Sequence, residues 1–217
     1  MSTANDAKNP YGDFARPEMH RFVPPGTQRL LDVGCNLGAF GHALKQRGVA
    51  EVWGVEMVEA AAQQAATRLD RVLLGSFESV ELPDAYFDAI SFNDVLEHMV
   101  EPAAALRLAV RKLRLGGVVI ASIPNLRNFD NLVHIVLDRD FRYESAGIRD
   151  RTHLRFFTLK SIPALYEGTG LHITRIEGIN ENWWQPSWRR RLAFRLFAKQ
   201  LADTRYLQYA VVATPQG

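Results

Sequence analysis

An α/β fold with a mainly parallel sheet is the architecture that this sequence predicts. Short apolar runs alternate with segments of helical periodicity, and their spacing of about 10–15 residues is typical of βαβ units. A glycine-rich turn, LLDVGCNLGAFG at residues 30–41, follows the first run. The chain has 217 residues, of which 47% are hydrophobic and 23% charged, and this size and composition suit one globular domain with additions.

Seven segments are expected to be strands, because they are apolar and bounded by turns. They are residues 29–34, 51–57, 71–76, 86–94, 118–124, 171–180 and 206–215. Helices are expected at about 37–47, 59–69, 102–115 and 159–167, where apolar residues recur at helical spacing or Pro and Gly mark the ends. Residues 125–157 are less regular, and residues 182–205 predict a basic amphipathic helix. One of the last two strands is expected to run antiparallel.

Composition and charge exclude several classes of function. A net charge of +2 gives no electrostatic case for nucleic-acid binding, and Cys35 has no second cysteine with which to form an internal disulfide. The first residues lack the apolar run of a secretory signal, and the longest apolar stretches fall short of the ~20 residues of a membrane span. A cytoplasmic location without a transmembrane segment is therefore expected. No metal site is predicted.

The glycine-rich turn indicates a nucleoside site. Gly34 and Gly38 let the backbone approach a ligand closely, and Asn36 tolerates the left-handed conformation of a third glycine. Glu56 ends the next strand, where an acid is well placed to accept hydrogen bonds from ribose hydroxyls. The spacing is G-x-N-x-G rather than G-x-G-x-x-G, and no basic residue stands ready for a pyrophosphate. A nucleoside without phosphates is favoured over a dinucleotide, and a plain tight connection is the alternative.

Four segments in this order resemble the successive motifs of class I S-adenosylmethionine-dependent methyltransferases of the ubiquinone/menaquinone and type 11/12 group. They are LLDVGCNLGAFG, VWGVEM, GSFESVELPDAYFDAISFNDVLEHMVEP and LRLGGVVIASIPN, within residues 28–180. The resemblance implies a Rossmann-like sheet of seven strands in the order 3-2-1-4-5-7-6, with strand 7 antiparallel. It implies S-adenosylmethionine as the methyl donor and S-adenosylhomocysteine as the product. The acceptor would be a small molecule or a carrier-linked sugar, lipid or quinone-like compound, methylated on O, N or C.

The resemblance also implies a set of cofactor-binding residues. Asp32 would orient the turn and the methionine amino group, Glu56 would hold the ribose, and Met57 would pack on the adenine. The other implied contacts are Gly34, Cys35, Asn36 and Gly38 in the turn, Gly75, Ser76 and Phe77 after the third strand, and Asn93, Asp94 and Val95 after the fourth. Ser76 stands where the family often has an Asp that takes the adenine amino group, so Ser76 or the backbone of Phe77 is expected to substitute.

Residues 1–27 are expected to form an N-terminal lid, in which Tyr11 and Arg16 approach the cofactor and the Arg pairs with the methionine carboxylate. Residues 28–217 would then be a single methyltransferase domain. Acceptor-side insertions are expected at about 125–157 and 181–205. The basic helix in the second insertion is compatible with cover for the acceptor pocket, which we favour, and with peripheral membrane contact.

A hydroxyl acceptor calls for a general base, and His98, His153 and Asp94 are the candidates. His153 lies in RDRTHLRFF, between Arg151 and Arg155, whose charges would favour the neutral imidazole. A solvated charged turn is the structural alternative for this segment, and loop packing is the alternative for His98. Two rival functions remain at this stage: a nicotinamide-dependent oxidoreductase and a non-catalytic nucleoside-binding module.

Overall fold

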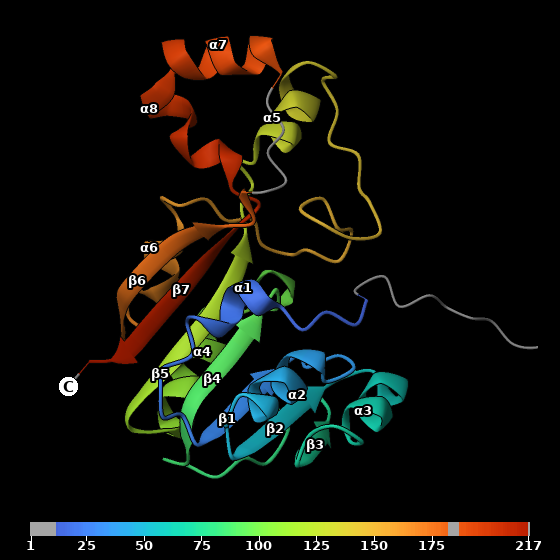
Figure 1. Ribbon diagram of the computed structural model, residues 1–217, viewed down its shortest axis with the longest axis vertical. Helices are drawn as coiled ribbons and strands as arrows, with labels where there is room; N and C mark the ends of the chain where they lie inside the picture. Colours follow the sequence, from blue (N-terminus) through green and yellow to red (C-terminus); the bar gives the residue numbers. More distant parts are fainter. Residues whose placement is uncertain (1–11, 182–186, 217) are drawn as a thin grey trace, which may run out of the picture.

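Seven strands form one sheet in the computed structural model, which describes residues 12–181 and 187–216. The strands are β1 (Arg29–Val33), β2 (Glu51–Glu56), β3 (Arg71–Leu74), β4 (Phe87–Asn93), β5 (Leu113–Pro124), β6 (Leu171–Ile179) and β7 (Gln208–Pro215). Their order is β3-β2-β1-β4-β5-β7-β6, and β7 runs antiparallel to β5 and β6 (Figure 1). The predicted fold class and strand order are confirmed.

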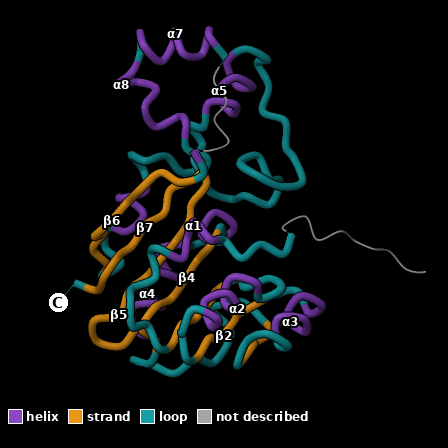
Figure 2. Tube along the Cα trace, viewed as in Figure 1, coloured by secondary structure: helices purple, strands orange, loops and turns teal. Residues whose placement is uncertain are grey.

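Helices cover both faces of the sheet, as Figures 1 and 2 show. One face carries α1 (Pro17–His20), α2 (Ala39–Gln46) and α3 (Glu59–Ala65), and the other carries α4 (Pro102–Lys112) and α6 (Ile162–Tyr166). Each layer has its own buried apolar cluster, because successive residues of a strand point to opposite faces. Leu30 of β1 packs in the cluster of α1 and α2, whereas Leu31 packs in the cluster of α4 and α6.

Part of the predicted N-terminal lid belongs to the core. Met19 of α1 and Phe22 just after it are almost completely buried, in the same cluster as Leu30 and Phe40. The sequence suggested no core role for this stretch because two apolar residues three apart make too short a pattern to stand out. The segment is therefore anchored to the sheet at residues 19–22.

The boundary between α4 and β5 differs from the prediction. The helix ends at Lys112 rather than near Gly116, and β5 begins at Leu113. Gly116, with φ +77°, therefore lies within the strand, near a break in the β4–β5 register between Phe87 and Ala89. The Gly116–Gly117 pair, which the sequence predicts to end a helix, lies instead in β5 where the β4–β5 pairing is irregular.

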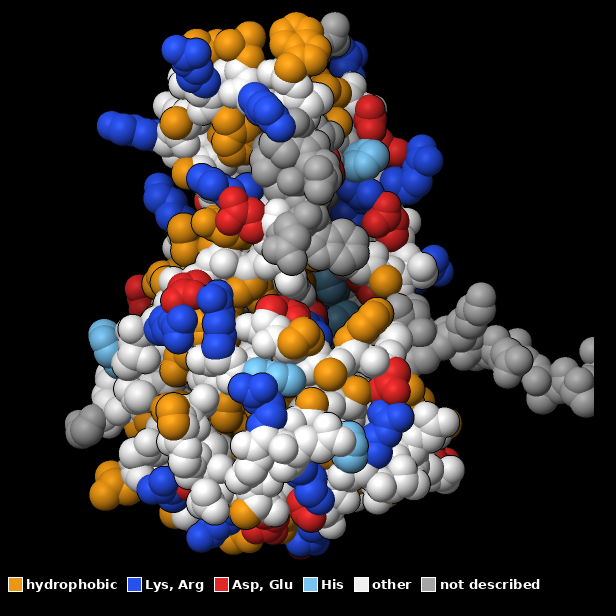
Figure 3. All heavy atoms as spheres, in the orientation of Figure 1, with side chains coloured by type: hydrophobic (Ala, Val, Ile, Leu, Met, Phe, Trp, Pro, Cys, Tyr) orange, Lys and Arg blue, Asp and Glu red, His pale blue; other side chains and the backbone are white. Residues whose placement is uncertain are grey.

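The two predicted insertions meet at one end of the molecule. Helices α5 (Phe129–Val136), α7 (Trp188–Leu196) and α8 (Ala198–Leu201) lie beyond the carboxyl ends of β4 and β5, at the top of Figure 1. Ring contact between Phe129 and Phe194, at 5.9 Å between centroids, joins α5 to α7. Hydrophobic and basic side chains are both visible over this upper part in Figure 3.

Among the described residues, no helix has both the length and the apolar character needed to cross a membrane.

Candidate active site

A cavity of about 1000 Å³ opens beside the carboxyl ends of β1, β2 and β4. Five segments wall it: the N-terminal segment before α1, the turn after β1 with the start of α2, the end of β2 with the start of α3, the end of β4 with the short helix η1 (Leu96–His98), and the loop after α5 at Ala146. Eleven of the predicted site residues line it: Arg16, Asp32, Gly34, Cys35, Asn36, Glu56, Met57, Asn93, Asp94, Val95 and His98. They come from four separate parts of the sequence, so the fold brings together what the motifs only suggested.

The turn after β1 has the backbone that its sequence predicts. Gly34, Asn36 and Gly38 all have positive φ, at +69°, +47° and +80°. The Asn36 amide, however, donates through Nδ2 to the carbonyl oxygen of Gly12 at 2.7 Å, and so ties the turn to the N-terminal segment. The turn therefore presents bare backbone to the cavity at Gly34, whereas the side chain of Asn36 is hydrogen-bonded to the N-terminal segment.

Glu56 stands at the end of β2 with its carboxylate against this turn. Its Oε2 accepts the backbone N–H of Asn36 at 2.9 Å, and its Oε1 accepts that of Val58 at 2.8 Å. A carboxylate has about four lone-pair positions, so each oxygen keeps the capacity to accept another hydrogen bond. Met57, next in sequence, is 72% exposed on the cavity wall and offers an apolar surface for a flat ring.

Asp32 is buried at the floor of the cavity. Burial raises the pKa of this carboxyl to about 7, against a hydrogen bond from Ser91 Oγ at 2.8 Å that lowers it. Asn93 lies on the same wall, and its buried amide atoms make no hydrogen bond of normal length with the described residues. The Asn93 amide also acts on Asp32 and lowers its pKa, and the two groups together are suited to a polar or cationic ligand.

Arg16 reaches the cavity, but its charge is already neutralised by the protein. Its guanidinium contacts Asp94 Oδ2 at 2.5 Å and Glu18 Oε1 at 2.8 Å, and also donates to Ser122 Oγ. Gln208 donates to the same Asp94 carboxylate. Arg16 thus ties the N-terminal segment to the ends of β4 and β5, and its pairing with a ligand carboxylate stays a prediction.

Five predicted site residues do not line the cavity: Gly38, Gly75, Ser76, Phe77 and His153. A Cβ at Gly38 would lie 3.1 Å from the backbone of Ala65, so this glycine allows close packing of α2 on α3. Phe77 is buried and packs edge-on against Phe92. Tyr11 lies outside the described residues.

Ser76 and Gly75 follow β3 at the far side of β2. The Ser76 hydroxyl contacts Ser79 Oγ at 3.1 Å, within its own turn. The cavity wall that sequence reasoning assigned to this turn is instead formed by α3, through Ala60, Ala61 and Gln64. The sequence indicates only a helix in this Ala/Gln run, although its first turn begins three residues after Glu56.

Burial raises the pKa of the Cys35 thiol, and the nearby Asp32 and Glu56 charges add to that shift. The cysteine is thus a protonated wall residue at neutral pH rather than a thiolate nucleophile.

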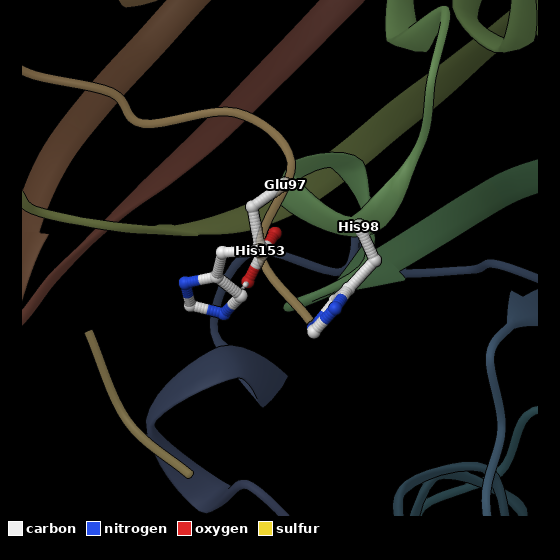
Figure 4. Close-up of side chains that lie close together, drawn as sticks. All are labelled: Glu97, His98 and His153. Atoms are coloured by element: carbon white, nitrogen blue, oxygen red, sulfur yellow. Dashed lines mark ion pairs between the residues drawn. The ribbon is translucent and has the colours of Figure 1, made fainter. Parts of the chain in front are cut away.

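Glu97, His98 and His153 form a close cluster, in which the two imidazole rings are in edge contact and the Glu97 carboxylate lies beside them (Figure 4). The ring centroids of His98 and His153 are 4.7 Å apart, and His153 Nε2 lies 3.9 Å from Glu97 Oε1. Burial, together with the charge of Asp94, raises the pKa of Glu97 well above its usual range.

His153 and His98 differ in their access to the cavity. His98 lines it, whereas His153 is 8% exposed and has its Nδ1 3.1 Å from the carbonyl oxygen of Ile148. The pKa of His153 is lowered, as expected, but by burial first and then by the charge of His98. The flanking Arg151 and Arg155 are not the cause, because Arg155 turns away to the carbonyl oxygen of Val100 and Arg151 is exposed.

Comparison with known proteins gives a consistent picture. A family model described as a methyltransferase domain matches residues 9–176. The ubiquinone biosynthesis O-methyltransferase of Neisseria meningitidis is 23% identical over 160 residues, which cover 70% of this chain and 67% of that protein. The enzyme of the same name from Alkalilimnicola ehrlichii is 34% identical over 121 residues, 52% of this chain and 48% of its own length. The chain thus spans half to two thirds of these relatives.

A solved structure of similar fold is a SAM-dependent methyltransferase from Archaeoglobus fulgidus. It has a TM-score of 0.66 at 21% identity and covers 90% of both chains. This likeness supports the fold.

Proposed function

This chain belongs to the class I S-adenosylmethionine-dependent methyltransferases, and we propose that it methylates a hydroxyl oxygen of a small aromatic, quinone-type acceptor with His98 as the general base. The observation that carries the proposal is the place of His98 on the wall of the cavity that also holds the glycine turn, Asp32 and Glu56. The named relatives, which are O-methyltransferases of ubiquinone biosynthesis, support the choice of acceptor class.

The cavity has the groups that such a cofactor needs. Bound S-adenosylmethionine supplies a methyl group activated by the positive sulfur. The protein has to align the acceptor with that methyl group and keep water out. Glu56 is placed for ribose hydroxyls, Met57 for the adenine face, and Asp32 with Asn93 for the amino group of the methionine part. His98 is placed to take the proton of the acceptor hydroxyl.

Acceptor identity is tested with a panel of catechols and other phenols, nucleotide sugars and phospholipids. The measurements are release of S-adenosylhomocysteine and the position of a trideuteromethyl label in the product. We expect turnover with a catechol and the label on oxygen. Binding of S-adenosylhomocysteine without turnover on any acceptor would contradict the proposal, and so would a label on nitrogen or carbon.

Glu56→Ala is expected to weaken S-adenosylhomocysteine binding by about 1.5–3 kcal/mol, roughly 10- to 150-fold, the range for hydrogen bonds to a charged group. Glu56→Gln keeps one acceptor oxygen, so its affinity for S-adenosylhomocysteine should lie between those of the wild type and Glu56→Ala. Isothermal titration calorimetry measures the affinity, and thermal unfolding shows whether the turn has loosened. Glu59→Ala is the matched control, because Glu59 is exposed on α3 and does not line the cavity. Equal affinities for both alanine variants would remove Glu56 from the ribose site.

Cofactor affinity is expected to rise with pH because of Asp32. With a pKa of about 7 in the free protein, this carboxyl is mainly neutral at pH 6 and mainly ionised at pH 8. Only the ionised form attracts the ammonium of S-adenosylhomocysteine, so affinity should increase about tenfold between these pH values. Asp32→Asn should bind weakly and without this slope. Ser91→Ala removes the hydrogen bond that lowers the pKa of Asp32, so it should shift the midpoint to higher pH.

A further inference from the structure

A chain of hydrogen bonds leads from the cavity to a buried carboxylate that the reaction scheme has not used. His98 Nδ1 lies 3.0 Å from Thr152 Oγ1 and 3.3 Å from the carbonyl oxygen of Thr152. The Thr152 hydroxyl donates in turn to Asp150 Oδ1 at 2.7 Å, and the backbone N–H of Thr152 donates to the same oxygen at 2.8 Å. Asp150 is 1% exposed. The three side chains form a continuous path from the cavity wall into the protein.

The direction of each hydrogen bond determines which nitrogen of His98 carries the proton. A carbonyl oxygen only accepts, so the contact with the Thr152 carbonyl requires a proton on Nδ1. The Thr152 hydroxyl proton is directed at Asp150, and its oxygen is therefore the acceptor toward His98. Both contacts select Nδ1–H facing Thr152, and in the neutral ring this tautomer leaves Nε2 as the basic nitrogen.

The loop that carries Asp150 and Thr152 is fastened to the short helix that carries His98. The carbonyl oxygen of Glu97 accepts the backbone N–H groups of Leu154 at 2.8 Å and Arg155 at 3.0 Å. Glu97 and His98 are adjacent in η1, so these bonds fix the loop within one residue of the histidine. The 54-residue separation of His98 and Thr152 in sequence is thus bridged by backbone as well as side-chain contacts.

We propose that Asp150 and Thr152 are positioning residues, which hold the His98 ring and its Nδ1–H tautomer so that Nε2 receives the proton of the acceptor. The inference rests on the proposed function only for the proton transfer, since the tautomer is a property of the protein alone. Asp150 acts through the Thr152 hydroxyl, and neither residue lines the cavity. A carboxylate behind a hydroxyl serves here to orient an imidazole, as a carboxylate does directly in hydrolase triads.

The first test reads the tautomer and needs no acceptor. Two-bond ¹H–¹⁵N correlation spectra of the full-length protein distinguish Nδ1–H from Nε2–H, and His98→Gln identifies the His98 signals by their loss. We expect the Nδ1–H form in the wild-type protein and a mixture of both forms in Thr152→Val. Thr152→Ser keeps the hydroxyl and should keep the wild-type spectrum. A predominant Nε2–H form in the wild-type protein would overturn the inference, whatever the acceptor is.

The second test separates positioning from binding. The assay uses an acceptor that the wild-type enzyme methylates. Thr152→Val and Asp150→Asn are each expected to lower kcat about 3- to 10-fold, because one neutral hydrogen bond to the base is lost or weakened. KM for S-adenosylmethionine should stay within twofold of wild type. Thr152→Ser should restore kcat. Thr174→Val, which removes a hydroxyl bonded to β7, is the matched control. Unchanged kcat in Thr152→Val would overturn the positioning role, whereas unchanged kcat in His98→Gln would overturn the proposed base itself.

Discussion

Gly34→Val is expected to reduce the affinity for S-adenosylhomocysteine by at least about 100-fold. Gly34 lines the cavity with φ +69°, a conformation that β-branched residues rarely adopt. A Cβ there would lie 2.6 Å from Cγ2 of Val95, which follows the neighbouring strand β4. The new side chain would therefore clash with Val95 and displace the cavity wall, in addition to straining the turn. Calorimetric titration of the folded variant measures the loss.

A matched glycine separates the two effects. Gly116 has φ +77° in β5, and a Cβ added there meets no atom within 4 Å. Gly116→Val should thus share the backbone cost of about 1–2 kcal/mol in the free energy of unfolding, while it leaves cofactor affinity as in the wild type. If both variants bound S-adenosylhomocysteine equally well, the turn at Gly34 would not be the place where the cofactor approaches the backbone.

The sheet could be predicted from the sequence because its signals are local. Strands such as β4 and β5 are buried on both faces and rich in apolar residues, and Pro102 marks the start of the helix α4 between them. The order of the strands is not a local property. It came from the resemblance of four motifs to one family, and the structure confirms it.

The cavity was predicted only where a strand ends. Asp32, Glu56 and Asn93 each lie at the carboxyl end of a parallel strand, where the topology places ligands. The contribution of α3 was missed, because an Ala/Gln helix carries no chemical signal. The pairing of Arg16 with Asp94 was missed as well, since no sequence pattern relates two residues 78 positions apart.

The choice between the two histidines shows the same limit. His153 was singled out for its neighbours in sequence, Arg151 and Arg155, but what matters is its burial and its contact with His98. His98 stands in a short helix after β4, and its chemical interest depends on Thr152 and Asp150, which the sequence placed in another segment. A role that depends on contacts across the fold becomes visible only in three dimensions.

His98→Gln is expected to lower turnover by about 10²–10⁴-fold, the usual contribution of a general base, with S-adenosylhomocysteine affinity within about threefold of wild type. Glutamine keeps a hydrogen-bonding group on the cavity wall but cannot take a proton at neutral pH. The effect should appear in kcat and kcat/KM alike, because the interaction with the departing proton is made in the transition state. Product formation under saturating S-adenosylmethionine measures it.

His153→Gln provides the comparison, since this ring is stacked edge-on against His98 but does not line the cavity. Loss of a group that supports the base without touching the acceptor should lower kcat by about tenfold or less. The two variants thus rank the histidines: a larger loss of kcat in His153→Gln than in His98→Gln would return the role of base to His153, as its sequence context suggests.

The acidity of the acceptor gives a second test of the base. An acceptor hydroxyl that is already ionised needs no base, so the loss in His98→Gln should shrink for phenols of low pKa. A loss independent of acceptor pKa would identify His98 as an orienting group instead, because only proton removal depends on the acidity of the hydroxyl.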